Sequence, residues 1–330
     1  MKSSGFCIFE YDENEETLIT FIFPSIDDEM KSVIQETAHY LIKGSNSLSL
    51  FTFFKNKWLY FEGIRNPSRN SPVRLYGICL LADDLHPALY SKLAQVLCAT
   101  IVKSGEAPKV LRGYLLSIEK GSLSCDNNEF DINDYSESCF EEASFDVILD
   151  RAGSNIPLIW QALVSGHSVT IYSPDLSVLQ ACAVPILSLC RPGFRQLLPL
   201  VMDSSEIQTT HALSIKNPIW CTTDVSALNG HSDLTLDLST RTVKLSPQFQ
   251  KETGREKLVE SLKEVINNAT ASENSVADAV EEFNNEIVGI LNQVKVKYGD
   301  ITSQSIQNLK LSPETKMLLS TIAANGVFNL

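Results

Sequence analysis

Residues 145–202 have the sequence FDVILDRAGSNIPLIWQALVSGHSVTIYSPDLSVLQACAVPILSLCRPGFRQLLPLVM, in which short apolar runs alternate with turn residues. The first run, Phe145–Leu149, and the last, Leu197–Met202, are predicted strands. The β-branched run His167–Tyr172 between them is too short for a helix and predicts a third strand. Three strands separated by apolar segments predict a parallel sheet that is buried on both faces.

The two segments between these predicted strands have helix signals. Pro157 suits the first turn of a helix over Ile156–Val164, and Gly166 ends it. Apolar residues then recur with a period close to 3.6 from Leu176 to Leu189, which predicts a second helix. No residue of this α/β segment has the chemistry expected of an active site.

Composition restricts the classes of function. The chain has 330 residues and a formal net charge of -13, which disfavours a nucleic-acid partner. The start of the chain has no signal-peptide pattern, and no apolar run is long enough for a transmembrane helix. The eight cysteines lack metal-ligand spacing and mostly lie in apolar runs, so we expect a reducing, cytoplasmic environment and no bound metal or cofactor.

Residues 1–120 predict an α+β lobe with an antiparallel sheet. Ser25 and Asp28 have the spacing of a capping box for the first helix. The predicted strands are Phe6–Tyr11, Thr17–Phe23, Leu48–Phe54, Trp58–Ile64 and Val73–Leu81. A first helical face runs from Met30 to Leu41, Pro87 begins a second helix, and a short helix spans Val110–Ile118.

The remaining segments divide by composition. Residues 121–144 are polar, acidic and poor in aliphatic side chains, which predicts a mobile linker. The α/β lobe is assigned to residues 145–249, and residues 250–330 form a helical segment. In the α/β lobe we expect a helix at Ser204–Leu213 and strands at Pro218–Thr223, Leu234–Leu238 and Arg241–Leu245. In the helical segment we expect an apolar helical face from Leu258 to Ile266, a longer one from Val276 to Val294, and a last helix at Glu314–Ala324.

The central lobe resembles the DENN domain family. Leu163, Val169, Ile171 and Ser173 match the family pattern for a helix followed by a strand, and Leu198-Pro-Leu-Val201 matches its Pro-containing strand. Further similar stretches are Leu179 to Phe194, Pro218-Ile-Trp220, Leu234-Thr-Leu-Asp-Leu238 and Leu311–Leu319. The length and layout are similar to the smallest class of the family.

The resemblance implies a fold and a partner. The expected fold is an N-terminal longin-like lobe, a central α/β DENN lobe and C-terminal helices, with the two lobes forming a cradle for another protein. The implied function is regulation of a Rab-family small GTPase, through exchange of GDP for GTP, in endosomal membrane traffic. Binding the nucleotide-free GTPase more tightly than the loaded one lowers nucleotide affinity without bond-making chemistry. Membrane association is expected only through partners.

Four residues are candidate contacts for such a partner. Arg65 and Arg69 lie in a Pro/Asn/Ser-rich loop, from which an arginine projects into the GTPase in related longin-DENN proteins. His167 and Asp175 flank the central predicted strand. In the plainer interpretation, Arg65 and Arg69 belong to a solvated loop. His167 and Asp175 are then ordinary residues at the ends of a strand. We expect no catalytic residue.

Two alternatives remain open at this stage. The first is a scaffold subunit of an endosomal trafficking complex without exchange activity. The second is a GTPase-activating protein that uses Arg65 or Arg69 as an arginine finger.

Overall fold

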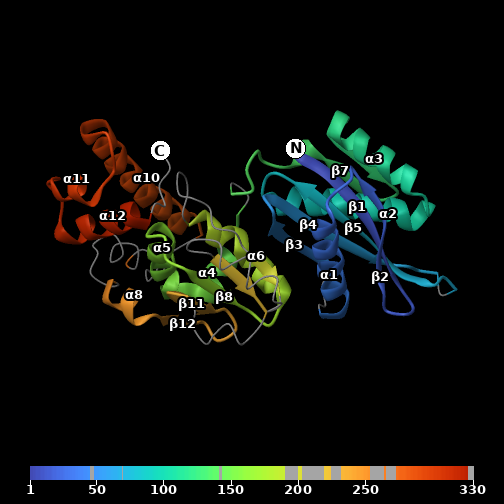
Figure 1. Cartoon of the computed structure of the whole chain (residues 1–330), viewed down its shortest axis with the longest axis horizontal. Helices are drawn as coiled ribbons and strands as arrows, with labels where there is room; N and C mark the ends of the chain where they lie inside the picture. The colour runs from blue at the N-terminus through green and yellow to red at the C-terminus, as the bar shows by residue number, and fades with distance from the viewer. Residues whose placement is uncertain are drawn as a thin grey trace. The chain divides into compact units, whose positions relative to one another are not determined.

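The computed structural model describes residues 1–44, 48–68, 70–140, 143–189, 200–202, 219–223, 232–252, 264 and 273–325. The chain divides into two compact units, Met1–Glu142 and Ala143–Leu330, which are described separately (Figure 1). Both units combine helices with a five-stranded sheet. The mixed α+β character predicted from the sequence is therefore confirmed.

The first unit contains an antiparallel sheet with strand order β2-β1-β5-β4-β3. Its strands are β1 (Ser3–Asp12), β2 (Thr17–Phe23), β3 (Ser49–Phe54), β4 (Lys57–Arg65) and β5 (Val73–Ala82). These are the five strands that the aromatic and β-branched runs predict. Phe9 lies across Gly77 of β5, where a Cβ atom would collide with its ring.

Helices cover both faces of this sheet. They are α1 (Asp28–Gly44), α2 (Pro87–Ser104) and α3 (Ala107–Lys120). Phe6 packs on Tyr114 of α3, and Tyr60 packs on Tyr90 of α2, so α2 and α3 share one face. Neighbouring residues of a strand point to opposite faces. The other face is packed against α1, which contacts β1, β2 and β3 and lies in front of the sheet in Figure 1.

The start of α1 differs from the predicted capping box. Oδ1 of Asp27 accepts a hydrogen bond from the backbone N–H of Met30 at 2.7 Å. Asp27 therefore supplies the cap, and the expectation for Ser25 and Asp28 is wrong. The helix begins at Asp28, so Asp27 occupies the N-cap position, where a side-chain oxygen accepts a backbone N–H of the first turn.

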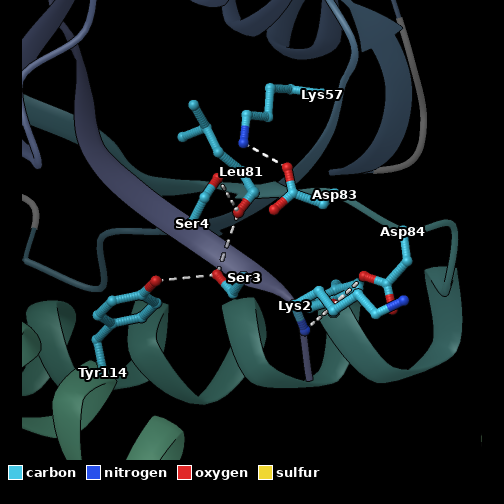
Figure 2. A network of polar contacts seen from close by, with 9 residues as sticks. Lys2, Ser3, Ser4, Lys57, Leu81, Asp83, Asp84 and Tyr114 are labelled. Atoms are coloured by element: carbon cyan, nitrogen blue, oxygen red, sulfur yellow. Dashed lines mark hydrogen bonds and ion pairs between the residues drawn. The ribbon is translucent and has the colours of Figure 1, made fainter.

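Polar contacts attach the beginning of β1 to the end of β5 (Figure 2). The Ser3 hydroxyl donates to the Leu81 carbonyl at 3.2 Å and lies 3.0 Å from the Tyr114 hydroxyl of α3. The backbone N–H of Lys2 donates to the Tyr90 hydroxyl at 2.9 Å, and Tyr90 in turn donates to Asp84. These bonds tie one end of the sheet to the helices on one of its faces.

Part of the stretch predicted as a mobile linker is an ordered hairpin. Strands β6 (Ser122–Cys125) and β7 (Asn128–Asp131) pair antiparallel and are followed by a 3-10 turn, η1 (Ile132–Asp134). The hairpin packs on α2, and Phe130 is only 2% exposed. Mobility is therefore the wrong expectation for residues 122–134. The sequence of this stretch is mostly polar and acidic, so the contribution of its one aromatic residue, Phe130, is not evident from composition.

The second unit contains a mostly parallel sheet with strand order β12-β11-β8-β10-β9. Its strands are β8 (Val169–Tyr172), β9 (Leu200–Met202), β10 (Ile219–Thr222), β11 (Leu234–Asp237) and β12 (Thr242–Leu245). Only β12 runs antiparallel to its neighbour, β11. The strand predicted over His167–Tyr172 is thus the central strand of a sheet.

The first apolar run of the α/β segment is a helix and not a strand. It forms α4 (Asp146–Ala152), which is followed by a 3-10 turn, η2 (Gly153–Asn155). Phe145, Ile148 and Ala152 are buried, with the i, i+3, i+7 spacing of one helical face. A five-residue apolar run does not distinguish strand from helix by periodicity, which explains the wrong prediction.

The other helices of this unit follow the sequence pattern more closely. They are α5 (Ile156–Val164), α6 (Leu176–Ser188), α8 (Pro247–Glu252), α10 (Glu273–Tyr298), α11 (Ser303–Gln307) and α12 (Pro313–Asn325). Gly166 has φ 72°, which suits the left-handed turn between α5 and β8. The helix predicted at 204–213 and the helical face predicted from Leu258 to Ile266 lie outside the described residues.

Candidate functional site

A pocket of about 590 Å³ lies within the second unit, beside the N-terminal ends of two adjacent parallel strands. His167 lies two residues before β8, and Asp233 immediately precedes β11. The wall is formed by Gln248 of α8, Gln307 of α11 and one face of α12. The residues from α12 are Pro313, Met317, Ser320, Thr321 and Ala324.

The carboxylate of Asp233 connects three segments beside this pocket. Its Oδ2 accepts hydrogen bonds from the backbone N–H and the hydroxyl of Ser168, at 3.0 and 2.9 Å, and lies 3.4 Å from Nδ1 of His167. Its Oδ1 accepts the Ser246 hydroxyl at 3.3 Å. Burial raises the pKa of Asp233, but the bonds from Ser168 and the neighbouring His167 outweigh it and hold the pKa below its usual value.

His167 has a position fixed by packing as well as by this carboxylate. Its side chain is 7% exposed, and its ring lies 4.6 Å from the Phe249 ring, centroid to centroid. The Ser168 hydroxyl donates to Asp233 and accepts the backbone N–H of Asp233 at 2.9 Å. The Ser168 hydroxyl is thus bonded to Asp233. In a Ser-His-Asp triad the serine hydroxyl is bonded to the histidine, so this arrangement differs from one that activates a nucleophile.

The chemistry that this pocket offers is hydrogen bonding. Amides of Gln248 and Gln307 and hydroxyls of Ser320 and Thr321 line it, together with the side chains of Met317 and Ala324. Among the residues that the structure describes, no group of three or more His, Cys, Asp or Glu side chains is arranged to hold a metal ion.

The structure places His167 and Asp175 at opposite ends of the same strand. His167 precedes β8, whereas Asp175 follows it and is the N-cap of α6. Asp175 Oδ1 accepts hydrogen bonds from the hydroxyl and the backbone N–H of Ser177, at 2.7 and 2.9 Å, and these bonds lower its pKa. These two candidates do not form one cluster, and Asp175 has a clear structural role.

The predicted arginines belong to the first unit. Arg65 is the exposed last residue of β4 and pairs in register with Leu75 of β5. Within the described part of the chain, no ion pair involves Arg65. Arg69 lies outside the described residues.

Asp233 is the residue that the sequence analysis missed. It occurs in a polar stretch before β11 and has no motif around it. Its partners Ser168 and His167 are about 65 residues away in sequence and become neighbours only because β8 and β11 pair. Periodicity gives no signal for such a contact.

Comparison with known proteins adds the family context for this arrangement. No family model matches the chain. It is 25% identical over 272 residues to DENN domain-containing protein 10 of Dictyostelium discoideum, covering 73% of this chain and 72% of the relative. It is 27% identical over 210 residues to DENN domain-containing protein 10 of Danio rerio, covering 61% of this chain and 60% of that relative.

These two matches support membership of the DENN domain family. The resemblance inferred from the packing motifs of the central lobe thus has independent support along most of the chain. The matched region spans less than two thirds of the length of the Danio rerio protein. None of the described helices is long and apolar enough to cross a membrane.

Proposed function

We propose that this DENN-family chain is a guanine nucleotide exchange factor for a Rab-type small GTPase in endosomal membrane traffic. The observation that supports the proposal is the similarity to DENN domain-containing protein 10 from two organisms. In the same proposal, the first unit corresponds to the longin-like lobe and the second to the α/β DENN lobe with its C-terminal helices. Recruitment to membranes would occur through protein partners.

Exchange requires binding energy and no covalent step. A factor that binds the nucleotide-free GTPase more tightly than the GDP-bound form lowers the affinity for GDP by the same factor. Coupling free energies of this kind are typically about 1–3 kcal/mol. Rigid surfaces suit this task, because they do not lose conformational entropy when they bind.

The proposed contacts are Arg65 in the first unit and His167 and Asp175 in the second. Arg65 and Asp175 are exposed, so their side chains are accessible to a partner. His167 packs against Phe249 and lines the pocket, so a partner would contact it there. Arg65 is the best probe of the three, because its replacement removes no described hydrogen bond.

The test is release of fluorescently labelled GDP from a panel of purified Rab GTPases, measured with the full chain and an excess of unlabelled GTP. We expect faster release for at least one Rab, in proportion to the concentration of the chain. A pulldown with nucleotide-free and GTP-loaded Rabs measures the state preference separately. Binding to a Rab without any acceleration would reject the exchange factor and favour the scaffold.

A further inference from the structure

Two cysteines face each other across neighbouring strands of the first unit. Cys7 of β1 and Cys79 of β5 are direct partners in the antiparallel register. Both side chains are 0% exposed, and both are free thiols in this structure. The Cys79 thiol donates to the Leu80 carbonyl at 3.9 Å, and Cys7 is close enough to raise its pKa. The pair is therefore a preformed dithiol inside the sheet.

The backbone geometry of this pair suits a disulfide bond. Directly opposed residues of antiparallel strands have Cα atoms roughly 4.5 or 5.5 Å apart, depending on which type of pair they form. Disulfides span Cα separations of roughly 4.4–6.8 Å. Either type of pair thus brings the two thiols within bonding reach without separating β1 from β5.

The surrounding structure controls access to the dithiol. Phe6 and Tyr60 point to the face that carries α2 and α3, and Leu80 is the partner of Tyr60. Because neighbouring residues alternate, Cys7 and Cys79 point to the other face, on which α1 packs. Reagents can reach the thiols only when α1 opens locally.

Helix α1 is held over this face by one apolar stripe and by contacts at its surface. The buried residues of the stripe are Met30, Val33, Ile34, Ala38 and Leu41. The polar links are exposed, namely Lys55 with Asp27 and Glu29, at 3.3 and 2.5 Å. Exposed ion pairs contribute little to stability, so the apolar stripe sets the free energy of opening.

We propose that Cys7 and Cys79 are a latent redox site, which low-molecular-weight disulfides such as oxidised glutathione convert to a cross-strand disulfide when α1 opens. In the first step one thiol loses its proton and attacks oxidised glutathione, forming a mixed disulfide and releasing one glutathione thiolate. The second cysteine, also deprotonated, attacks the mixed disulfide and releases the second glutathione. Two cysteine thiols are oxidised, and one disulfide of glutathione is reduced to two thiols.

The closed form protects the pair from this chemistry. Burial raises the pKa of the Cys79 thiol, and contact with Cys7 raises it further, so little thiolate exists while α1 is in place. The disulfide would close a loop from residue 7 to residue 79, which includes β2, α1, β3 and β4. A loop of this length strongly restricts the unfolded chain, so the oxidised first unit resists unfolding.

The test treats the full native chain with oxidised glutathione, blocks the remaining thiols with N-ethylmaleimide in denaturant, and digests without reduction. Mass spectrometry is expected to find the peptides of Cys7 and Cys79 joined and lighter by two hydrogens. The oxidised chain is expected to unfold at higher urea than the reduced chain, and dithiothreitol should reverse the shift. Recovery of both cysteines as N-ethylmaleimide adducts, or links only between other cysteines, would overturn the proposal.

Three variants separate the site from general oxidation. Cys79→Ala should remove the link and the reversible shift in urea, and leave Cys7 as a mixed disulfide. Cys98→Ala is the matched control: that buried thiol donates to the Tyr76 carbonyl at 3.1 Å, and its loss should leave the link intact. Ile34→Ala weakens the apolar stripe of α1 and should speed oxidation at least several-fold. An unchanged rate in Ile34→Ala would contradict control by α1.

Discussion

The indole Nε1 of Trp160 on α5 donates a hydrogen bond to Oδ1 of Asn284 on α10, at 3.0 Å. The amide of Asn284 also donates to the Leu189 carbonyl, just beyond α6, at 2.9 Å. Both Trp160 and Asn284 are 0% exposed. One buried amide thus joins α10 to α5 and to the residue that follows α6, and its bond to Trp160 spans 124 residues of sequence.

Replacement of Asn284 with Ala should therefore destabilise the second unit by about 2–3 kcal/mol, because the Trp160 indole and the Leu189 carbonyl would both be left buried without this partner. Urea unfolding followed by circular dichroism measures the change. The neighbouring Asn285 is exposed on the same helix, so Asn285→Ala should change stability by no more than about 0.5 kcal/mol. Equal effects of the two substitutions would show that the buried amide is not the connection.

Loss of the Asp233 carboxylate should destabilise the chain in a pH-dependent way. The folded pKa of Asp233 lies below the usual 3.8, so its contribution is present above pH 3.8 and is lost as pH falls through the folded pKa. Asp233→Asn should cost about 1–2 kcal/mol at neutral pH, and the difference from wild type should shrink in acid. The control is Asp300→Asn at an exposed turn. A constant difference at all pH values would contradict the role of the charge.

Glu62 on β4 should have the opposite pH dependence. Burial raises its pKa from 4.5 to about 7, although Ser49 donates to its Oε1 at 2.5 Å. The unfolded chain releases this proton at lower pH, so stability should fall as pH rises from 4.5 to about 7.

Glu62→Gln should remove this fall and leave the variant more stable than wild type above pH 7, by on the order of 1 kcal/mol or more. Below pH 4.5 the two proteins should be similar. The measurement is urea unfolding on both sides of this range, and Glu119→Gln on the exposed surface of α3 is the control. If the free energy of unfolding of wild type and Glu62→Gln changed in parallel with pH, the prediction would be wrong.

Much of this architecture is predictable from local patterns. Strands β1 to β5 are located by their aromatic and β-branched runs. Strand β8 is located by the glycine turn before it and the capped helix after it. The run Phe145–Leu149, which forms the beginning of α4, is too short for its period to be resolved. The β6–β7 hairpin is anchored by Phe130, a buried residue in a mostly polar stretch, whose partner across the two strands is Leu123.

The candidate site is less predictable than the fold. His167 stands out in the sequence, but the partner that orients it, Asp233, becomes its neighbour only through strand pairing. Asp175 attracts attention as an acid near a strand, yet the structure uses it to cap α6. Tertiary contacts of this kind leave no trace in periodicity.

Arg65 provides a site-specific test of partner binding. Its exposed guanidinium is at the end of β4, so Arg65→Ala should leave stability within about 0.5 kcal/mol of wild type. We expect it to weaken binding to the cognate Rab by about tenfold. The matched control is Arg74→Ala on the adjacent strand, where the guanidinium lies 3.5 Å from Glu13. Equal binding by wild type and both variants would remove Arg65 from the proposed interface.

The most direct test of the proposed exchange activity is the rate of labelled GDP release from each member of a Rab panel, with and without the full chain. We expect at least one Rab to release GDP at least tenfold faster with micromolar chain, which corresponds to an activation barrier lower by about 1.4 kcal/mol. Arg65→Ala should reduce this acceleration, and Arg74→Ala should retain it. Release at the intrinsic rate from every Rab, with a folded chain in the assay, would contradict the account.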